Sequence, residues 1–144
     1  MSIQVAIVMG SASDWDVMSN ASKLLDKFGI EHESRVLSAH RTPKQLEEFI
    51  VEAEKNGTQV FIAGAGLAAA LPGVVAAQTT IPVIGVPTSV GYGYGEKGVA
   101  ALASMLQSCS LGLSVVNIDN GIGAGAIASK IANLLSKNNS EKKS

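Results

Sequence analysis

The chain has very little cysteine, few histidines and almost no net charge. Its one cysteine, Cys109, excludes an internal disulfide and fits a reducing compartment such as the cytoplasm. Two histidines and one cysteine, set apart in the sequence, argue against a zinc site. A net charge of −1 argues against nucleic acid as a partner, because binding it normally requires a basic surface. We therefore expect a cytoplasmic protein without a metal centre.

Long apolar runs and a basic leader are also missing. No apolar run reaches the ~18 residues of a membrane-spanning helix, so we expect no membrane contact. No basic segment precedes the first apolar stretch, so no signal peptide is expected. What is abundant is aliphatic: 47% of residues are hydrophobic and only 4% aromatic, which predicts a core of Val, Ile, Leu and Ala. At 144 residues, one domain is the simplest organisation.

Strand-like and helical patterns alternate along the chain. Apolar, β-branched runs predict strands over 3–9, 59–63, 82–86 and 113–118, and the segment 31–37 is predicted as a further strand. Helical spacing predicts helices over 17–28, 43–55, 71–78, 97–108 and 124–135, with a polar tail over 137–144. This alternation implies parallel pairing through right-handed crossovers. We predict a single α/β domain over 1–136, a three-layer sandwich of flavodoxin or Rossmann type with about five strands.

Every unusual loop of the sequence follows a predicted strand. In open parallel sheets, the carboxyl ends of the strands lie at one edge, and ligands bind there. We therefore expect five loops to share that edge: 10–14, 38–43, 64–73, 87–96 and 117–123.

The second loop, Ser38-Ala39-His40-Arg41-Thr42-Pro43, carries the strongest chemical signal. His40 can give and take a proton near neutral pH, and Arg41 with the hydroxyls suits a phosphate or carboxylate. Pro43 is typical of the first turn of a helix, whose N-terminus attracts anions. The alternative is a solvent-exposed histidine in a capping turn, but the position after a strand favours the functional interpretation.

The first loop, Gly10-Ser11-Ala12-Ser13-Asp14, combines small and polar residues. Its hydroxyls and amides could bind a phosphate, and Asp14 could accept hydrogen bonds from sugar hydroxyls. A helix cap formed by Ser13 or Asp14 explains the same residues equally well. The loop lacks both the Gly-Lys-Ser/Thr ending of a Walker motif and the three spaced glycines of a dinucleotide site. A nicotinamide cofactor is therefore disfavoured.

The remaining candidates are less specific. The loop 64–73 has no ionisable side chain, so it could offer backbone amides to a carboxylate or simply allow close helix–sheet packing. The glycine-rich segment 91–98 could cover the site as a flap. Asp119 fits a catalytic role and a turn role equally. We expect a surface role for His32 and a buried structural role for Cys109.

Together these motifs resemble the PurE family of purine biosynthesis, the N5-carboxyaminoimidazole ribonucleotide mutases and aminoimidazole ribonucleotide carboxylases. The resemblance runs from about Val5 through Val86, with several matches in order at family-like spacing. The matching segments are Met9-Gly10-Ser11, Ser13-Asp14-Trp15, the hexapeptide Ser38-Ala39-His40-Arg41-Thr42-Pro43, Ala63-Gly64-Ala65-Gly66 and Leu71-Pro72-Gly73.

The resemblance implies a flavodoxin-like, cofactor-free enzyme that assembles as a homo-octamer. It would act on a small ribonucleotide, moving a carboxylate from N5 to ring carbon C4 with carbon dioxide held in the closed site. His40 matches the family's proton shuttle, and the amides of 64–66 would hold the carboxylate or carbon dioxide. The substrate-binding residues that the resemblance implies are Ser11, Ser13, Asp14, Ser38, Arg41, Gly64, Ala65 and Gly66.

Two departures from the family pattern leave alternatives open. Leu67 replaces the second glycine of the third loop in common mutases, and Ala70 replaces a histidine, so His40 is the only family-type imidazole. From Pro87 onward, the chain resembles a PurE-related carboxylase domain that makes a pyridinium biscarboxylate nucleotide. We favour the mutase. The alternatives are a carboxylase using free carbon dioxide, on this or another aromatic nucleotide, and a non-catalytic nucleotide-binding protein.

Overall fold

One parallel sheet organises the chain. The computed structural model describes residues 3–143, and the side chains among them as far as residue 138. The strands are β1 (Val5–Met9), β2 (His32–Val36), β3 (Val60–Ala65), β4 (Val83–Pro87) and β5 (Leu113–Val115). The α-helices are α1 (Trp15–Lys27), α2 (Pro43–Lys55), α3 (Leu71–Gln78), α4 (Val99–Leu106) and α5 (Gly121–Lys143). Two short 3₁₀ helices are η1 (Ala12–Asp14) and η2 (Gly93–Gly95).

The strand order is β2-β1-β3-β4-β5, with every neighbouring pair parallel. This is the flavodoxin-like order, so the predicted fold class is confirmed. The chain leaves β1 toward β2 on one side and returns to β3 on the other. Met9 pairs with Gly64 at the ends of these two strands, so their following loops start at the same level. Such a switch point opens a crevice at the carboxyl edge of the sheet.

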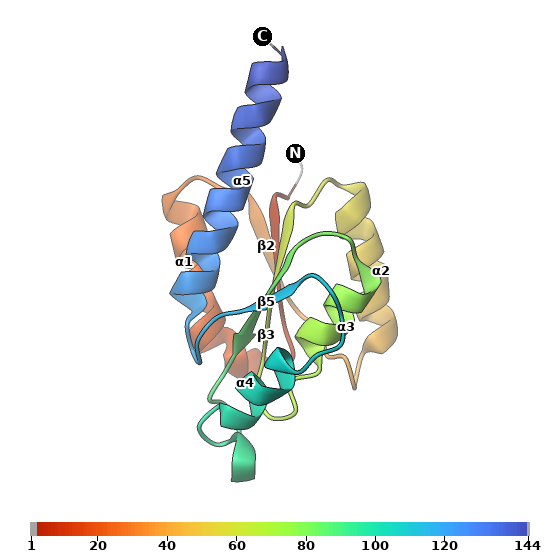
Figure 1. Cartoon of the computed structure of the whole chain (residues 1–144), viewed down its shortest axis with the longest axis vertical. Helices are drawn as coiled ribbons and strands as arrows, with labels where there is room; N and C mark the ends of the chain where they lie inside the picture. The colour runs from red at the N-terminus through yellow and green to blue at the C-terminus, as the bar shows by residue number, and fades with distance from the viewer. Residues whose placement is uncertain (1–2, 144) are drawn as a thin grey trace.

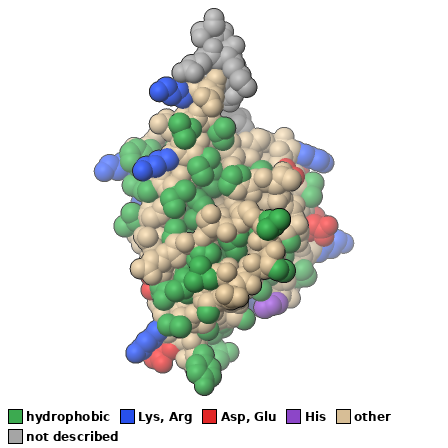
Figure 2. All heavy atoms as spheres, viewed as in Figure 1, with side chains coloured by type: hydrophobic (Ala, Val, Ile, Leu, Met, Phe, Trp, Pro, Cys, Tyr) green, Lys and Arg blue, Asp and Glu red, His purple; other side chains and the backbone are tan. Residues whose placement is uncertain are grey.

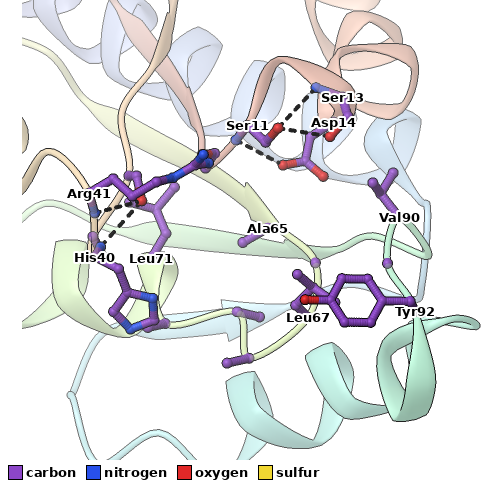
Figure 3. Close-up of a pocket in the computed structure, with 18 residues that line it drawn as sticks. Ser11, Ser13, Asp14, His40, Arg41, Ala65, Leu67, Leu71, Val90 and Tyr92 are labelled. Carbon is purple, nitrogen blue, oxygen red and sulfur yellow. Dashed lines mark hydrogen bonds between the residues drawn. The ribbon is translucent and has the colours of Figure 1, made fainter.

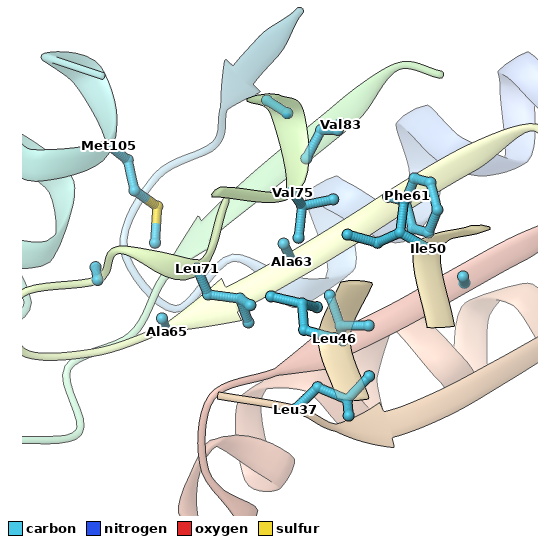
Figure 4. Packing of buried hydrophobic residues seen from close by; sticks show 14 of the residues in the cluster. Leu37, Leu46, Ile50, Phe61, Ala63, Ala65, Leu71, Val75, Val83 and Met105 are labelled. Carbon is cyan, nitrogen blue, oxygen red and sulfur yellow. The ribbon is translucent and has the colours of Figure 1, made fainter. Parts of the chain in front are cut away.

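Helices cover both faces of the sheet, which explains the unbroken apolar strands. Helices α1 and α5 lie on one face, and α2 and α3 lie on the other (Figure 1). On the α2 side, Leu46, Ile50, Phe61 and Val75 belong to one buried cluster (Figure 4). A second cluster joins β1, β3 and β4 to α1 and α5. Because all five residues of β1 are buried, its sequence reads as a continuous apolar run rather than an alternating one.

Three expectations differ from the structure. Helix α5 begins at Gly121 and runs to Lys143, longer than the predicted 124–135, and projects past the body of the molecule (Figure 1). Strand β5 ends at Val115, because the chain then turns toward α5. Cys109 is exposed rather than buried, since α4 ends at Leu106, before the cysteine. Within residues 3–143, no helix is both long and apolar enough to span a membrane.

Candidate active site

A cavity of about 680 Å³ lies at the carboxyl edge of the sheet. Its walls come from the loops after β1, β2, β3 and β4, four of the five loops predicted to meet there (Figure 3). The lining residues are 10–11, 13–14, 38–41, 65–71 and 90–92. The cavity therefore sits where the topology predicts a ligand site.

The loop after β1 forms the 3₁₀ turn η1, capped by its own side chains. The Ser11 hydroxyl accepts from the Ser13 N–H at 3.3 Å, and the Ser11 N–H donates to the Asp14 carboxylate at 3.2 Å. This reciprocal pair is a capping box. The Ser11 and Ser13 hydroxyls lie 2.8 Å apart and both residues line the cavity. Capping and ligand binding are thus compatible here, with Ser11 as the capping residue.

Asp14 is buried at the base of this loop, with only 2% of its surface exposed. The Thr88 hydroxyl donates to its Oδ1 at 2.7 Å. Burial raises the pKa of Asp14, the hydrogen bonds from Thr88 and from the Ser11 backbone oppose that rise, and the nearby Asp119 charge adds to it. Thr88 is a site residue that the sequence analysis did not single out. Its only signal was a hydroxyl directly after a buried strand.

The loop after β2 is fixed by the hydroxyls of Ser38 and Thr42. The Ser38 N–H donates to the Thr42 hydroxyl at 2.8 Å, and the Thr42 hydroxyl donates to the Ser38 carbonyl at 3.2 Å. The Ser38 hydroxyl accepts from the N–H groups of His40 at 3.3 Å and Arg41 at 3.1 Å. These bonds hold the backbone that carries the side chains of His40 and Arg41.

Arg41 and His40 extend from this loop in different directions. The Arg41 guanidinium donates to the Gly10 carbonyl at 3.1 Å, so its charge lies beside the first loop and its hydroxyls. His40 is exposed and lines the cavity, and its imidazole has no hydrogen-bond partner among the residues described. Figure 3 shows the imidazole directed away from Arg41, toward the third loop. The loop therefore offers an anion-binding group and a separate, unengaged acid–base group.

The loop after β3 forms an apolar wall of the cavity. Ala65 and Gly66 line it as predicted, together with the following residues 67–71. Gly64 lies within β3 and is not among the lining residues; its carbonyl accepts from the Gly10 N–H at 3.1 Å. Leu67 (φ 55°) and Ala69 (φ 49°) adopt left-handed backbone conformations, which cost non-glycine residues roughly 1 kcal/mol or more each.

The other sequence candidates lie outside the cavity lining. The imidazole of His32 bonds the Ser22 hydroxyl at 2.9 Å and the Ile30 carbonyl at 2.9 Å, which fastens α1 to β2. Asp119 (φ 60°) accepts from the N–H of Ser89 at 2.8 Å and from its hydroxyl, so its carboxylate joins the loop after β5 to the loop after β4. In the described part of the chain, no group of three or more His, Cys, Asp or Glu side chains could hold a metal ion.

Comparison with known proteins places the chain among relatives. A family model described as AIR carboxylase matches residues 4–143. An N5-carboxyaminoimidazole ribonucleotide mutase of Haemophilus influenzae is 41% identical over 128 residues, covering 89% of this chain and 78% of that protein. This chain belongs to the AIR carboxylase family. A mutase of the same name from Saccharolobus solfataricus is 44% identical over 125 residues, covering 87% of this chain and 71% of that protein.

Solved structures agree with this family assignment. The crystal structure of Treponema denticola PurE aligns with a TM-score of 0.72 at 26% identity, covering 96% of this chain and 92% of that one. The predicted family resemblance is thus confirmed, and the family match extends past Val86 through the C-terminal half. The fourth loop, with Val90 and Tyr92 on the cavity wall, therefore belongs to the same family domain as the histidine loop.

Proposed function

We propose that this member of the AIR carboxylase family is an N5-carboxyaminoimidazole ribonucleotide mutase of purine biosynthesis. Relatives bearing that name are 41–44% identical over most of the chain. The observation that carries the proposal is one unengaged imidazole, His40, on the wall of a cavity that also holds the Arg41 cation of the same loop and the hydroxyls of the loop after β1. The reaction needs one group that moves a proton and one group that binds the anionic phosphate, and the cavity offers an imidazole and a guanidinium.

The polar end of the cavity would bind the ribose and the phosphate. Ser11 and Ser13 present paired hydroxyls, and Arg41 lies beside them. Guanidinium and hydroxyl donors suit phosphate oxygens. The buried carboxylate of Asp14 would accept from a sugar hydroxyl, and Ser38, which lines the cavity and fixes the loop, would contact the substrate beside Arg41. The backbone of Ala65 and Gly66 would face the migrating carboxylate.

His40 would move one proton within the site. Cleavage of the bond between N5 and the carboxylate carbon releases carbon dioxide, and the protonated imidazole supplies the proton that N5 takes up. Ring carbon C4 then attacks the trapped carbon dioxide to form the new carbon–carbon bond. C4 loses its proton to the imidazole, which regenerates the starting state. The net reaction is an isomerisation, and no outside oxidant, reductant or proton is consumed.

A carboxylase using free carbon dioxide is the second candidate. It is favoured by Ala70, which lines the cavity and leaves His40 as the only imidazole among the lining residues of the described chain. With one imidazole, the site has the groups for attack by C4 on carbon dioxide and removal of its proton. The substrate offered to the enzyme separates the two reactions.

We further propose that the enzyme works as a cytoplasmic homo-octamer. Support comes from several large apolar side chains that the single chain leaves exposed, including Val99, Leu106 and Leu111. Several exposed apolar side chains on neighbouring segments of the chain are typical of subunit interfaces.

The proposal is tested by offering purified protein the N5-carboxylated nucleotide, or the uncarboxylated nucleotide with bicarbonate. Formation of the C4-carboxylated product from the first alone supports the mutase. Formation from the second alone supports the carboxylase. Binding of the nucleotides with no product from either supports a non-catalytic binding protein.

The role of His40 is tested in the same assay by His40→Asn. We expect turnover to fall about 10²–10⁴-fold, the usual contribution of a positioned acid–base group, with nucleotide affinity largely kept. His32→Asn is the matched control, since it replaces the other imidazole outside the cavity and should keep turnover. Near-normal activity of His40→Asn would show that another group moves the proton.

A further inference from the structure

The loops after β3 and β4 interlock through Leu67. A Cβ atom on Gly91 would lie 2.7 Å from the Leu67 Cδ2 atom, and one on Gly95 would lie 2.9 Å from the same atom. Both glycines are therefore required for the Leu67 side chain to occupy its place. Leu67 itself has a left-handed backbone at φ 55°, a conformation that packing must hold in place. The strained leucine and the two glycines form one packing unit.

The same two loops also pack against each other at a second contact. A Cβ atom on Gly66 would lie 2.2 Å from the Val90 carbonyl oxygen, so backbone meets backbone at this point. Tyr92 follows two residues later and caps η2, its carbonyl accepting from the Gly95 N–H at 2.9 Å. The backbone of Tyr92 is thus held between two points of contact with the third loop.

Tyr92 presents its side chain to the cavity from this supported backbone. The residue lines the cavity although 77% of its surface is exposed, and its hydroxyl has no hydrogen-bond partner within the described residues. Figure 3 shows the phenol ring reaching back from its own loop toward Leu67, on the side of the cavity away from His40. Tyr94, two residues on, is 97% exposed and does not line the cavity.

The chemistry of the walls indicates which part of a nucleotide lies near Tyr92. The charged and hydroxyl groups, those of Ser11, Ser13 and Arg41, belong to the first two loops. The wall beside Tyr92 is made of apolar residues, namely the alanine, glycine and leucine residues of 65–71 and Val90. A phosphate belongs at the first end, so the planar heterocycle of the same molecule belongs between His40, which exchanges protons with it, and the apolar wall beside Tyr92. An aromatic side chain there can stack on the heterocycle or contact its edge.

We propose that Tyr92 is a substrate-contacting residue that covers the heterocyclic ring of the ribonucleotide, and that Leu67 positions it. This inference rests on the proposed function for the identity of the ligand. It assigns the fourth loop a direct part in recognising the heterocycle, in addition to enclosing the site.

The test compares two ligands by calorimetric titration: aminoimidazole ribonucleotide, and ribose 5-phosphate, which lacks the heterocycle. Tyr92→Ala should weaken binding of the nucleotide about tenfold or more, in line with loss of one stacking contact, and leave ribose 5-phosphate unchanged. Tyr92→Phe should keep the nucleotide affinity. The matched control is Tyr94→Ala, which removes a neighbouring exposed ring and should change neither affinity.

The possible results separate this inference from the proposed function. Nucleotide affinity unchanged in Tyr92→Ala, or both ligands weakened equally, overturns the role of Tyr92. Tight nucleotide binding by the wild type without turnover overturns the mutase alone, because the affinities still decide on Tyr92. Failure of the wild type to bind the nucleotide overturns both.

The positioning role of Leu67 is tested by a double-mutant cycle. Leu67→Ala should weaken nucleotide binding about threefold to tenfold, a part of the Tyr92 effect, and Leu67→Met should restore it by refilling the contact with Gly91 and Gly95. In a Tyr92→Ala background, Leu67→Ala should have no further effect on affinity. Additive losses would show that Leu67 touches the ligand directly and does not act through Tyr92.

Discussion

Asp14 is a residue at which the demands of folding and of the site oppose each other. Its pKa is raised above the ordinary value of 3.8, chiefly by burial. At pH values between the ordinary pKa and the raised pKa, the folded state therefore binds more protons than the unfolded chain. The contribution of Asp14 to stability is then greatest at low pH and is lost as the pH rises through that window. The hydrogen bonds that Thr88 and the Ser11 backbone donate favour the charged carboxylate and oppose this rise in its pKa.

Thr88→Val tests this balance. It removes a buried donor to the Asp14 carboxylate, so we expect a loss of about 1.5–3 kcal/mol in the free energy of unfolding at about pH 7. The loss should shrink at about pH 4, where a protonated carboxyl needs the donor less. Urea unfolding at both pH values measures it. Thr58→Val is the matched control, since the buried Thr58 hydroxyl donates at 2.9 Å to the uncharged Ile3 carbonyl and its loss should not depend on pH. An equal loss of Thr88→Val at both pH values would contradict the argument.

Residues of the site were predictable where chemistry and position coincided. His40 and Arg41 stood out because ionisable side chains directly follow a strand, and Ser11 and Asp14 because polar residues follow the first one. Tyr92 and Leu67 could not be singled out in this way. Their place on the cavity wall depends on two loops that pack together across more than 20 residues of sequence, and on a left-handed leucine. The sequence shows the glycines but not which side chain they accommodate.

At the scale of elements, α1 and α5 pack with their backbones unusually close. A Cβ atom on Gly125 would lie 3.0 Å from the Ala21 Cα atom and 3.1 Å from its carbonyl oxygen. Ala124, Ala128 and Ala132 are fully buried along the same helix. Small residues at these positions let the two helices cover one face of the sheet together. This packing explains why the last helix is poor in large apolar residues where it is buried.

Gly125→Ala tests the closeness of that contact. Alanine would favour the helix by about 1 kcal/mol in isolation, but backbone atoms of α1 cannot yield as a flexible side chain would. We expect a net loss of about 1–3 kcal/mol in the free energy of unfolding, as in other overpacked contacts. Asn133→Ala, at an exposed position of α5, should stay within about 0.5 kcal/mol of the wild type. A more stable Gly125→Ala variant would show that the helices can move apart freely.

The existence and order of the elements followed from the sequence, but their ends did not. Most strands were predicted from apolar runs, since strands covered on both faces need no alternation, but β2 is a largely polar strand at the edge of the sheet. Helix α5 was predicted to stop at residue 135 because the residues beyond it are polar and lack a periodic apolar face. A helix continues through polar residues when its first turns are already fixed by packing, because adding each further residue costs little.

For the whole molecule, the deciding feature is the switch point between β1 and β3. The chain adds β2 on one side of β1 and then adds β3 on the other side, with all strands parallel. The alternation of strands and helices predicts parallel pairing, but it does not by itself fix the order of the strands. The order β2-β1-β3-β4-β5 brings the loops after β1 and β3 side by side, and the cavity opens there. The loop after β5 is separated from this crevice by β4, and the Asp119 carboxylate bonds Ser89 in the loop after β4 instead of lining the cavity.

The surface of the single chain also bears on its assembly. Figure 2 shows apolar side chains gathered over the face made by α4, β5 and α5. Among the large apolar residues of α4, Val99 and Leu106 are each 61% exposed, and Leu111 in the following loop is 90% exposed. Isolated apolar residues are normal on a surface, but several on neighbouring elements mark a site of association. Helix α4 is therefore expected to lie at a subunit interface of the proposed octamer.

Sedimentation equilibrium tests this expectation directly. The wild type should sediment as eight copies of the 14.8 kDa chain. The double variant Val99→Glu/Leu106→Glu should shift to smaller species, because burying an unpaired carboxylate in an apolar contact costs more than the contact returns. Val51→Glu, a matched change at an exposed valine on α2, should leave the mass unchanged. Dissociation by Val51→Glu alone would move the interface from α4 to α2, which covers the same face of the sheet. A monomeric wild type at micromolar concentration would exclude the octamer, leaving the exposed face of α4 to be explained by another partner.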